Sequence, residues 1–454
     1  MLQSINPFNQ EVVQNYKEYS QNEVDTIISD ADSEFNKWKQ TEFDIRSKLL
    51  RNTASILKNN IEEYSKIMTL EMGKPIRESR AEIEKCAWVC EYYAENGGKF
   101  LSPQEVKTDA SKSYVTFQPL GAILAVMPWN FPFWQVFRFA APTLMAGNVG
   151  ILKHSSNVTG CALAIEQIFR DAGFPKNTFQ TLLINSKVVA SVIENSAIKA
   201  VTLTGSTPAG KAVASKAGEM LKKTVLELGG SDPYIILEDA NLQKAVNSCS
   251  ISRLINTGQS CIAAKRFIVV ESVLEEFQTL LIKNMKNIIM GDPFNENTDI
   301  GPMARIDLRD ELHQQVIKSL RLGAKLLLGK QYSDDKGAFY PPTILTAVKP
   351  GMPAFDEELF GPVAAIVPTK DENDAIALAN NSVFGLGTAV FTEDIARGEI
   401  IASEKLEAGS CFVNDFVKSD PRLPFGGIKQ SGYGRELSDF GIREFVNIKT
   451  VYVK

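Results

Sequence analysis

The sequence has few histidines and few cysteines, which limits the kinds of active site it can build. Only two of its 454 residues are histidine, His154 and His313, and its six cysteines form no close cluster with them. A zinc site is therefore not expected, and a serine–histidine–aspartate triad would have to use one of these two histidines. The cysteines are also too sparse for a disulfide framework, so we expect reduced thiols and a cytoplasmic protein.

The chain also lacks long apolar runs and blocks of basic residues. No run approaches the roughly 20 apolar residues that cross a bilayer, and the N-terminal segment lacks the basic and apolar regions of a secretory signal. The formal net charge is -5 and no basic cluster is present. Neither a membrane nor a nucleic acid is therefore expected as a partner. The remaining composition is ordinary for a globular enzyme of two or three domains.

Hydrophobic periodicity indicates an α/β protein with a helical N-terminal part. Helical spacing covers residues 22–38, 42–70 and 78–96, and alternation predicts an exposed strand at 113–118. Beyond residue 121, short apolar runs alternate with helical stretches, which is typical of a parallel, Rossmann-type sheet. The predicted strands are 121–127, 149–152, 181–184 and 200–203, and the predicted helices are 133–146, 159–172, 187–195 and 208–222.

The α/β pattern begins again after residue 227 and predicts a second domain. Its strands are expected at 234–237, 267–270, 364–367 and 388–391, and its helices at 241–256, 273–289 and 371–381. The last residues of the chain, IKTVYVK, alternate and predict a terminal strand. Such a strand needs an edge to pair with, and a partner subunit could supply it.

The segment Asn256–Cys261 places a single cysteine after a short polar stretch that contains a glycine. Glycine lets the backbone turn sharply, and small neighbours leave the sulfur accessible to a ligand. An isolated cysteine is more often a small buried apolar residue than a nucleophile. The local sequence leaves both interpretations of Cys261 open.

Two other positions offer groups that a reactive thiol would need. Glu227 is a single carboxylate inside the apolar run VLELGG, where burial would raise its pKa toward that of a general base. It could equally be a strand-end residue that reaches solvent. Asn130, in the proline-pinned loop PWNFP, is either an oxyanion donor, which can contribute about 3 kcal/mol, or an ordinary turn residue.

Two further motifs lie near the ends of predicted strands. Lys153 and the serines that follow it stand where open α/β sheets bind ligands, although a lysine there is often only a solvated strand end. Residues 205–211, GSTPAGK, match the GxxxxGK pattern of a phosphate-binding loop. Ala212 stands where that loop needs serine or threonine for magnesium, and Pro208 removes an amide. This argues against an ATPase, although a helix N-terminus still suits a phosphate.

Taken together, seven motifs in family order resemble the aldehyde dehydrogenase superfamily over essentially the whole chain. They are PWNFP (128–132), KHSS (153–156), TGS (204–206), ELGG (227–230), NTGQSC (256–261), EELFGP (357–362) and PFGGIKQSGYGRE (424–436). The resemblance implies a Rossmann-like cofactor domain, an α/β catalytic domain and a small β oligomerisation unit. The absence of GxGxxG is consistent with it, because this family binds the pyrophosphate without that turn.

The resemblance also implies a covalent mechanism. Cys261 would be the nucleophile that attacks the aldehyde, and Asn130 with the Cys261 amide would hold the oxyanion. A nicotinamide must accept the hydride, since no side chain can. Glu227 would direct water to the resulting thioester. A relative that transfers its acyl group to coenzyme A would not need this base, so hydrolysis to an acid is favoured.

The cofactor site implied by the family draws on most of the motifs. Lys153 and Glu358 would bind the riboses, Phe360 would lie against the nicotinamide and Ser206 near the phosphates. NAD-preferring members commonly have glutamate where this chain has Ser156, which removes a charge that would repel a 2′-phosphate. We therefore expect NADP to be preferred and NAD to be accepted. The full predicted set is Trp129, Lys153, Ser155, Ser156, Gly205, Ser206, Glu358 and Phe360.

The substrate site implied by the resemblance points to succinic semialdehyde. Arg138 stands where succinate-semialdehyde dehydrogenases use an arginine to bind the distal carboxylate, although it could instead be paired with a structural carboxylate. A second arginine of some of those enzymes is Ile255 here, so the match is partial. Ser419 could supply the missing contact, and Lys418 and Arg422 are further candidates. Another small or medium aldehyde is the alternative substrate.

The expected domain limits follow from these motifs. Residues 1–107 with 125–226 would form the cofactor domain, and 227–430 the catalytic domain. Residues 108–124 with 431–454 would form the oligomerisation unit of a homodimer or homotetramer. A non-catalytic member of the family is the alternative that sequence leaves open.

Overall fold

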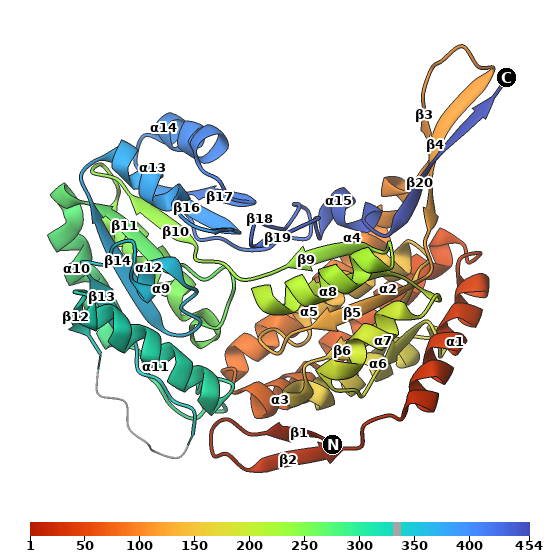
Figure 1. Ribbon diagram of the computed structural model, residues 1–454, viewed down its shortest axis with the longest axis horizontal. Coiled ribbons are helices and arrows are strands. Elements are labelled where there is room, and N and C mark those ends of the chain that lie inside the picture. Colours follow the sequence, from red (N-terminus) through yellow and green to blue (C-terminus); the bar gives the residue numbers. More distant parts are fainter. Residues whose placement is uncertain (330–336) are drawn as a thin grey trace.

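The structure is a computed structural model that describes residues 1–329 and 337–454. Two lobes, each built on one sheet, stand side by side, and a narrow arm that ends at the C-terminus projects from one of them (Figure 1). Within the described residues, no helix combines the length and the apolar character that a membrane crossing requires. The mixed helices and parallel sheets confirm the predicted α/β fold class.

Four helices precede the first sheet and share one apolar core with it. The first begins at a capping box formed by Ser20 and Glu23. The predicted helix over residues 42–70 is two helices, because the backbone leaves helical geometry at Asn60 (φ −115°, ψ 27°). A hairpin of β1 and β2, which periodicity did not predict, lies ahead of them. The elements are β1 (Leu2–Ile5), β2 (Val12–Tyr16), α1 (Gln21–Trp38), α2 (Phe43–Asn59), α3 (Ile61–Met72) and α4 (Ile76–Phe100).

The first sheet has the strand order β19-β9-β8-β5-β6-β7, parallel except for β19. The strand predicted at 181–184 is displaced: β7 ends at Thr181 because it pairs only with residues 150–152 of β6 before the chain turns. The strands are β5 (Ala122–Met127), β6 (Val149–His154), β7 (Phe179–Thr181), β8 (Ile198–Thr204), β9 (Lys223–Glu227) and β19 (Gly432–Tyr433). The helices are α5 (Trp134–Met145), α6 (Thr159–Asp171), α7 (Val189–Glu194) and α8 (Thr207–Glu219), with short turns η1 (Ser156–Val158) and η2 (Ser186–Val188).

The second sheet has the order β12-β13-β14-β11-β10-β16-β17, parallel except for β12. Alternate residues of β10 and β11 enter two separate apolar cores, so helices cover both faces. The strands are β10 (Pro233–Ile236), β11 (Arg266–Val270), β12 (Lys325–Leu328), β13 (Thr343–Thr346), β14 (Val363–Thr369), β16 (Gly387–Phe391) and β17 (Ser410–Val413). The helices are α9 (Leu242–Leu254), η3 (Ile255–Gly258), α10 (Glu271–Lys286), α11 (Ile306–Arg321), α12 (Pro353–Asp356), α13 (Glu372–Asn380), α14 (Ile395–Ile400) and η4 (Ile401–Lys405).

The arm is an antiparallel sheet of order β20-β4-β3. The C-terminal strand β20 (Val446–Val453) pairs with β4 (Lys112–Pro119), which also pairs with β3 (Gln104–Glu105). In the described chain, β4 is the only strand that pairs with β20, and Ile448, Tyr452 and Val453 of β20 are exposed. The remaining elements are β15 (Phe384–Gly385), β18 (Ile428–Lys429) and α15 (Ser438–Arg443).

The division of the chain into three units, with its limits, stays a prediction. Strand β5 begins at residue 122, so a limit at 124 divides it. Strand β19, which lies in the C-terminal segment assigned to the oligomerisation unit, joins the first sheet.

Candidate active site

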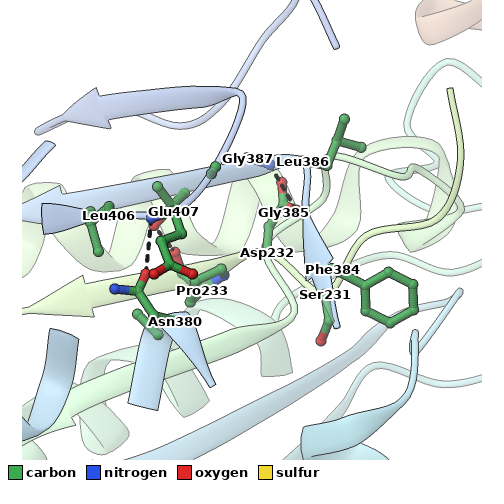
Figure 2. Close-up of a pocket in the computed structure, with 13 residues that line it drawn as sticks. Ser231, Asp232, Pro233, Asn380, Phe384, Gly385, Leu386, Gly387, Leu406 and Glu407 are labelled. Atoms are coloured by element: carbon green, nitrogen blue, oxygen red, sulfur yellow. Dashed lines mark hydrogen bonds between the residues drawn. The ribbon is translucent and has the colours of Figure 1, made fainter. Parts of the chain in front are cut away.

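One enclosed space lies at the base of β10 and is too small for an organic ligand. It measures about 10 Å³, roughly the space of one water molecule. Asp232 accepts a hydrogen bond from the Gly387 amide at 3.1 Å, and the Asn380 side chain accepts one from the Glu407 amide at 2.9 Å (Figure 2). The first bond joins the residue before β10 to β16, and the second joins α13 to the loop before β17, so this space belongs to the packing of the second sheet.

The loop that carries Cys261 has a backbone that few sequences allow. Asn256 and Thr257 have left-handed φ angles of 53° and 56°, and Gly258 has a φ of +76°. A Cβ at Gly258 would lie 2.3 Å from the backbone of Gly361, so only glycine fits there. The close approach packs the NTGQSC motif directly against the EELFGP motif.

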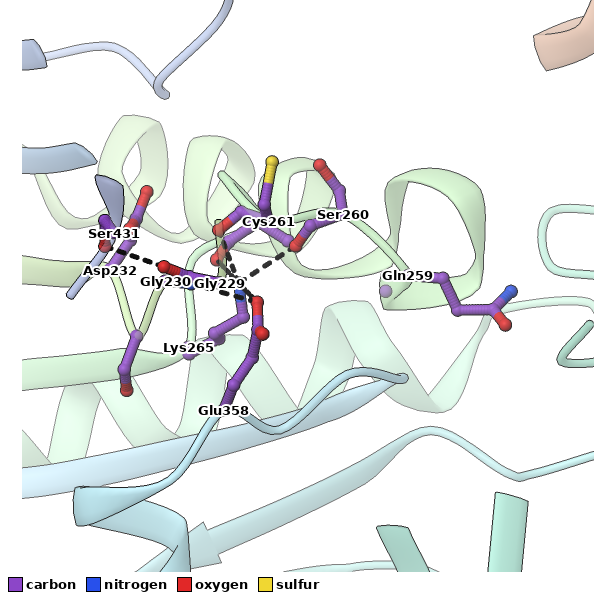
Figure 3. Close-up of polar contacts among 12 residues, drawn as sticks. Gly229, Gly230, Asp232, Gln259, Ser260, Cys261, Lys265, Glu358 and Ser431 are labelled. Carbon is purple, nitrogen blue, oxygen red and sulfur yellow. Dashed lines mark hydrogen bonds and ion pairs between the residues drawn. The ribbon is translucent and has the colours of Figure 1, made fainter. Parts of the chain in front are cut away.

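A buried lysine fixes the other side of this loop. Lys265 donates to the backbone carbonyls of Ser260 (2.9 Å), Cys261 (2.6 Å) and Ala263 (3.2 Å). Its ammonium also lies 3.4 Å from the Glu358 carboxylate. The sulfur of Cys261 points away from the Lys265–Glu358 pair (Figure 3). The ammonium therefore orients the loop while it leaves the thiol free.

Cys261 lies between two cavities and, among the described residues, is the only one that lines both. The larger cavity measures about 460 Å³ and runs toward the N-terminus of α8. The smaller measures about 180 Å³ and is lined by residues of α4 and α5 and by the loop before PFGG. A thiol shared by two cavities can react with a molecule in one while a second molecule occupies the other.

The resting thiol is protonated at neutral pH. Burial raises the pKa of Cys261 to about 12, although the charges of Lys265 and Arg138 act to lower it. The thiolate is the nucleophilic form. Catalysis therefore requires an acceptor for the proton of the Cys261 thiol. The sequence pattern could not predict the direction of this shift, since it depends on how tightly the loop is enclosed.

Asn130 is held close to the thiol by two hydrogen bonds. Its Nδ2 donates to the Gln259 carbonyl at 3.1 Å, and its own carbonyl accepts from Asn256 Nδ2 at 2.7 Å. The PWNFP loop is further fixed by His154, whose Nε2 is 2.9 Å from the Pro132 carbonyl. Burial lowers the pKa of His154 to about 4, so the ring is neutral. One Asn130 Nδ2 hydrogen remains available for an oxyanion in the cavity.

Glu227 is buried at the end of β9 but does not line either cavity in this conformation. Its two carboxyl oxygens have no hydrogen-bond partner in the described chain, and one lies beside Gly426. Burial, reinforced by the nearby Glu436 charge, raises the pKa of Glu227 well above its usual value. Because no bond holds the carboxyl in place, its rotation toward the cavity would break none.

The larger cavity combines aromatic walls with backbone amides at a helix N-terminus. Trp129 and Phe360 meet edge to face across it, with ring centroids 5.7 Å apart. Gly205 and Ser206 line it at the start of α8, where Ser206 makes no side-chain cap and leaves amides free for a phosphate. Glu358 lines its opposite wall and accepts from the Gly230 amide at 3.1 Å.

The other predicted cofactor residues lie outside this cavity, at the end of β6. Ser156 is exposed, whereas Lys153 and Ser155 are half-buried. Burial lowers the pKa of Lys153, and Ser155 donates to Asn157 at 2.7 Å. Lys211 of the GSTPAGK segment does not face the cavity and lies 3.4 Å from Gln430. This segment therefore lacks the phosphate-facing lysine of an ATPase loop.

The smaller cavity brings Arg138 and Ser419 together. Arg138 forms an ion pair with Glu436, and both side chains are almost fully buried. This is the structural pairing that the sequence left open for Arg138. Ser419 accepts a hydrogen bond from Lys85 at 2.8 Å. Lys85 was missed because a lysine on a long amphipathic helix carries no local signal of function.

Comparison with known proteins agrees with this geometry. The family model described as "Aldehyde dehydrogenase family" matches residues 1–451. A probable NADP(+) succinate-semialdehyde dehydrogenase of Synechocystis sp. is 50% identical over 452 residues, which cover 100% of this chain and 99% of that one. The NAD(P)+ succinate semialdehyde dehydrogenase Sad of Escherichia coli (strain K12) is 46% identical over 99% of this chain and 97% of its own length.

A solved structure gives the same result in three dimensions. Succinic semialdehyde dehydrogenase from Streptococcus pyogenes, in complex with NADP+, superposes with a TM-score of 0.98 at 36% identity and covers 100% of both chains. The fold is thus shared along the full length of both chains. The loop that presents Cys261 between two cavities is therefore that of a member of the aldehyde dehydrogenase family.

Proposed function

We propose that this protein oxidises succinic semialdehyde to succinate with NADP⁺ as its preferred cofactor and NAD⁺ as an accepted one. The observation that carries the proposal is the position of Cys261 between a larger cavity with aromatic walls and a smaller cavity with cationic walls. The similar Synechocystis and Streptococcus pyogenes proteins are both described with NADP. Another small or medium aldehyde, oxidised by the same mechanism, is the alternative.

Each proposed catalytic residue has one task. After the thiol proton has passed to solvent, the Cys261 thiolate adds to the aldehyde carbon, and the oxyanion that forms accepts hydrogen bonds from Asn130 Nδ2 and the Cys261 amide. After the carbon has lost its hydride, the acyl group is held as a thioester on Sγ. Glu227 takes a proton from water, which attacks the thioester and releases the acid. The raised pKa of Glu227, caused by burial and the nearby Glu436 charge, favours binding of the proton that the attacking water releases.

The nicotinamide cofactor, when bound, supplies the hydride acceptor that the side chains lack. The residues that would hold it are those predicted from the sequence. Trp129 and Phe360 would enclose the ring end, Gly205 and Ser206 the phosphates, and Glu358 one ribose. Lys153, Ser155 and Ser156 would meet the adenosine ribose beyond the edge of the cavity.

The substrate assignment can be tested with a panel of aldehydes. Purified protein is expected to form NADPH fastest, by kcat/KM, with succinic semialdehyde. Semialdehydes of other chain lengths and the uncharged butanal should be at least tenfold poorer, since an ionic contact with the distal carboxylate is worth about 1.4 kcal/mol or more. A plain aldehyde that matches succinic semialdehyde would instead favour the alternative.

Cofactor choice is expected to depend on Ser156. A Ser156→Glu substitution places a carboxylate where a 2′-phosphate would lie, so the ratio of kcat/KM for NADP⁺ to that for NAD⁺ should fall about 100-fold. Ser156→Ala is the matched control, because it removes the hydroxyl without adding charge, and should change the ratio far less. Unchanged NADP⁺ use in the glutamate variant would place the 2′-phosphate elsewhere.

We further propose a cytoplasmic protein that forms a homodimer or homotetramer through β20. Support comes from the exposed apolar residues on this strand and from its single pairing, with β4, in the described chain. A strand edge of this kind pairs readily with another chain.

A further inference from the structure

The smaller cavity has three cationic side chains in its wall, and two of them already have a counter-charge. Arg138 is paired with Glu436. Lys418 lies 2.7 Å from Asp415, and its side chain is 52% exposed. The third cation, Lys85, forms no ion pair with any carboxylate of the described residues. The charge of Lys85 is therefore the one that a ligand can still neutralise.

The two acidic residues of the same wall, Glu78 and Glu82, also have partners among the described residues. Glu82 is ion-paired with Lys74, and it accepts from the Phe133 and Trp134 amides at 2.9 Å each. Glu78 accepts from the Asn256 amide at 2.7 Å, and burial raises its pKa to about 7. The charges of Glu82 and Asp420 act to raise the pKa of Lys85, but among the described residues neither carboxylate forms an ion pair with it.

The surroundings of Lys85 hold its ammonium at the cavity wall. Its Nζ donates to Ser419 Oγ at 2.8 Å and lies 4.4 Å from the centroid of the Trp134 ring. Burial, together with the Arg138 charge, lowers the pKa of Lys85 to about 8, so it is mostly protonated at pH 7. Ser419 brings a hydroxyl to the same point, and a carboxylate could accept from both groups.

Another polar side chain of the wall, Gln135, has an oxygen without a hydrogen-bond partner among the described residues. Gln135 is 2% exposed, and the oxygen concerned is Oε1. Burial of an amide group without a partner is costly. An ionised carboxylate has no proton to donate to this oxygen, so Gln135 takes no part in the contact proposed below.

We propose that Lys85, positioned by Ser419, binds the distal carboxylate of the aldehyde substrate, while Arg138 serves the Glu436 pair. This inference rests on the proposed function and names the residue that gives it specificity. It restricts the substrate to short aldehydes with an anionic group at the far end. Cys261 and Lys85 line the same cavity of about 180 Å³, which leaves room for a short chain between thiol and ammonium.

The test compares succinic semialdehyde with butanal in Lys85→Met and Lys418→Met. Methionine keeps the length and apolar stem of lysine and removes the charge. In Lys85→Met the ratio of kcat/KM for succinic semialdehyde to that for butanal should fall about 100-fold, mainly through KM, because a contact made throughout the reaction is lost. In Lys418→Met, which removes a cation already paired with Asp415, the ratio should change less than about threefold.

Two more variants keep the test decisive if Lys85→Met does not fold. Lys85→Arg retains the charge and should keep most of the preference, and Ser419→Ala should raise KM for succinic semialdehyde about tenfold by releasing the ammonium. An unchanged preference in both Lys85→Met and Ser419→Ala, or equal losses in the two lysine-to-methionine variants, would overturn the assignment. A wild-type protein without any preference for succinic semialdehyde would instead contradict the proposed function.

Discussion

Replacement of Cys261 with alanine should lower kcat for aldehyde oxidation by about 10⁴-fold or more, since the covalent route is lost entirely. No other cysteine of the described chain lines either cavity, so none can take over the reaction. Binding of NADPH should persist, because the remaining walls of the larger cavity are unchanged. Steady-state NADPH formation and nucleotide fluorescence measure the two properties separately.

Cys411 provides the control for this experiment. Like Cys261, it is a free and half-buried cysteine, but it lies on β17 of the second sheet, away from both cavities. A Cys411→Ala variant should keep wild-type turnover. A Cys261→Ala protein that retained more than about a tenth of the activity would show that catalysis does not pass through this sulfur.

Replacement of Glu227 with glutamine should separate the two halves of the reaction. Glutamine has nearly the same shape but cannot take a proton from water, so steady-state kcat should fall about 100- to 1,000-fold. The thiol can still be acylated, and a rapid burst of about one NADPH per active site should precede slow turnover. Rapid mixing shows the burst, and intact-protein mass spectrometry shows the acyl group on the enzyme.

Glu71 offers a matched control for the loss of a buried carboxyl group. It is 1% exposed and accepts hydrogen bonds from the Gly160 and Cys161 amides, at a position that lines neither cavity. A Glu71→Gln protein should show normal turnover without acyl-enzyme accumulation. If the Glu227→Gln protein turned over slowly without a burst, Glu227 would be needed before the thioester forms, for example to take the thiol proton.

The sequence predicted the fold well where the signal was local. Apolar periodicity located most of the long helices and the central strands of both sheets, because burial on one face imposes it directly. The signal failed where local patterning is weak. The β1–β2 hairpin is largely exposed, and β7 is only three residues long. The helix α11 carries many charges that obscure its few buried positions.

The candidate site was predictable only in part, and for a related reason. Cys261, Asn130 and the cofactor residues stand in contiguous motifs, which a single stretch of sequence can reveal. The roles of Lys85 and Arg138 depend instead on partners distant in the chain. Lys85 meets Ser419 across 334 residues, and Arg138 meets Glu436 near the C-terminus. Whether a cation is already paired with a carboxylate depends on the tertiary structure, which periodicity and spacing do not reveal.

The sharing of Cys261 by two otherwise separate linings has an evolutionary consequence. Apart from Cys261, the two cavities are lined by different residues. Mutations can therefore change the lining of one cavity while the lining of the other stays the same. Changes along α4 or before PFGG would alter which aldehyde is accepted and leave nucleotide choice as it was. Single substitutions can thus change one cavity at a time, while Cys261, which lines both, has to be kept.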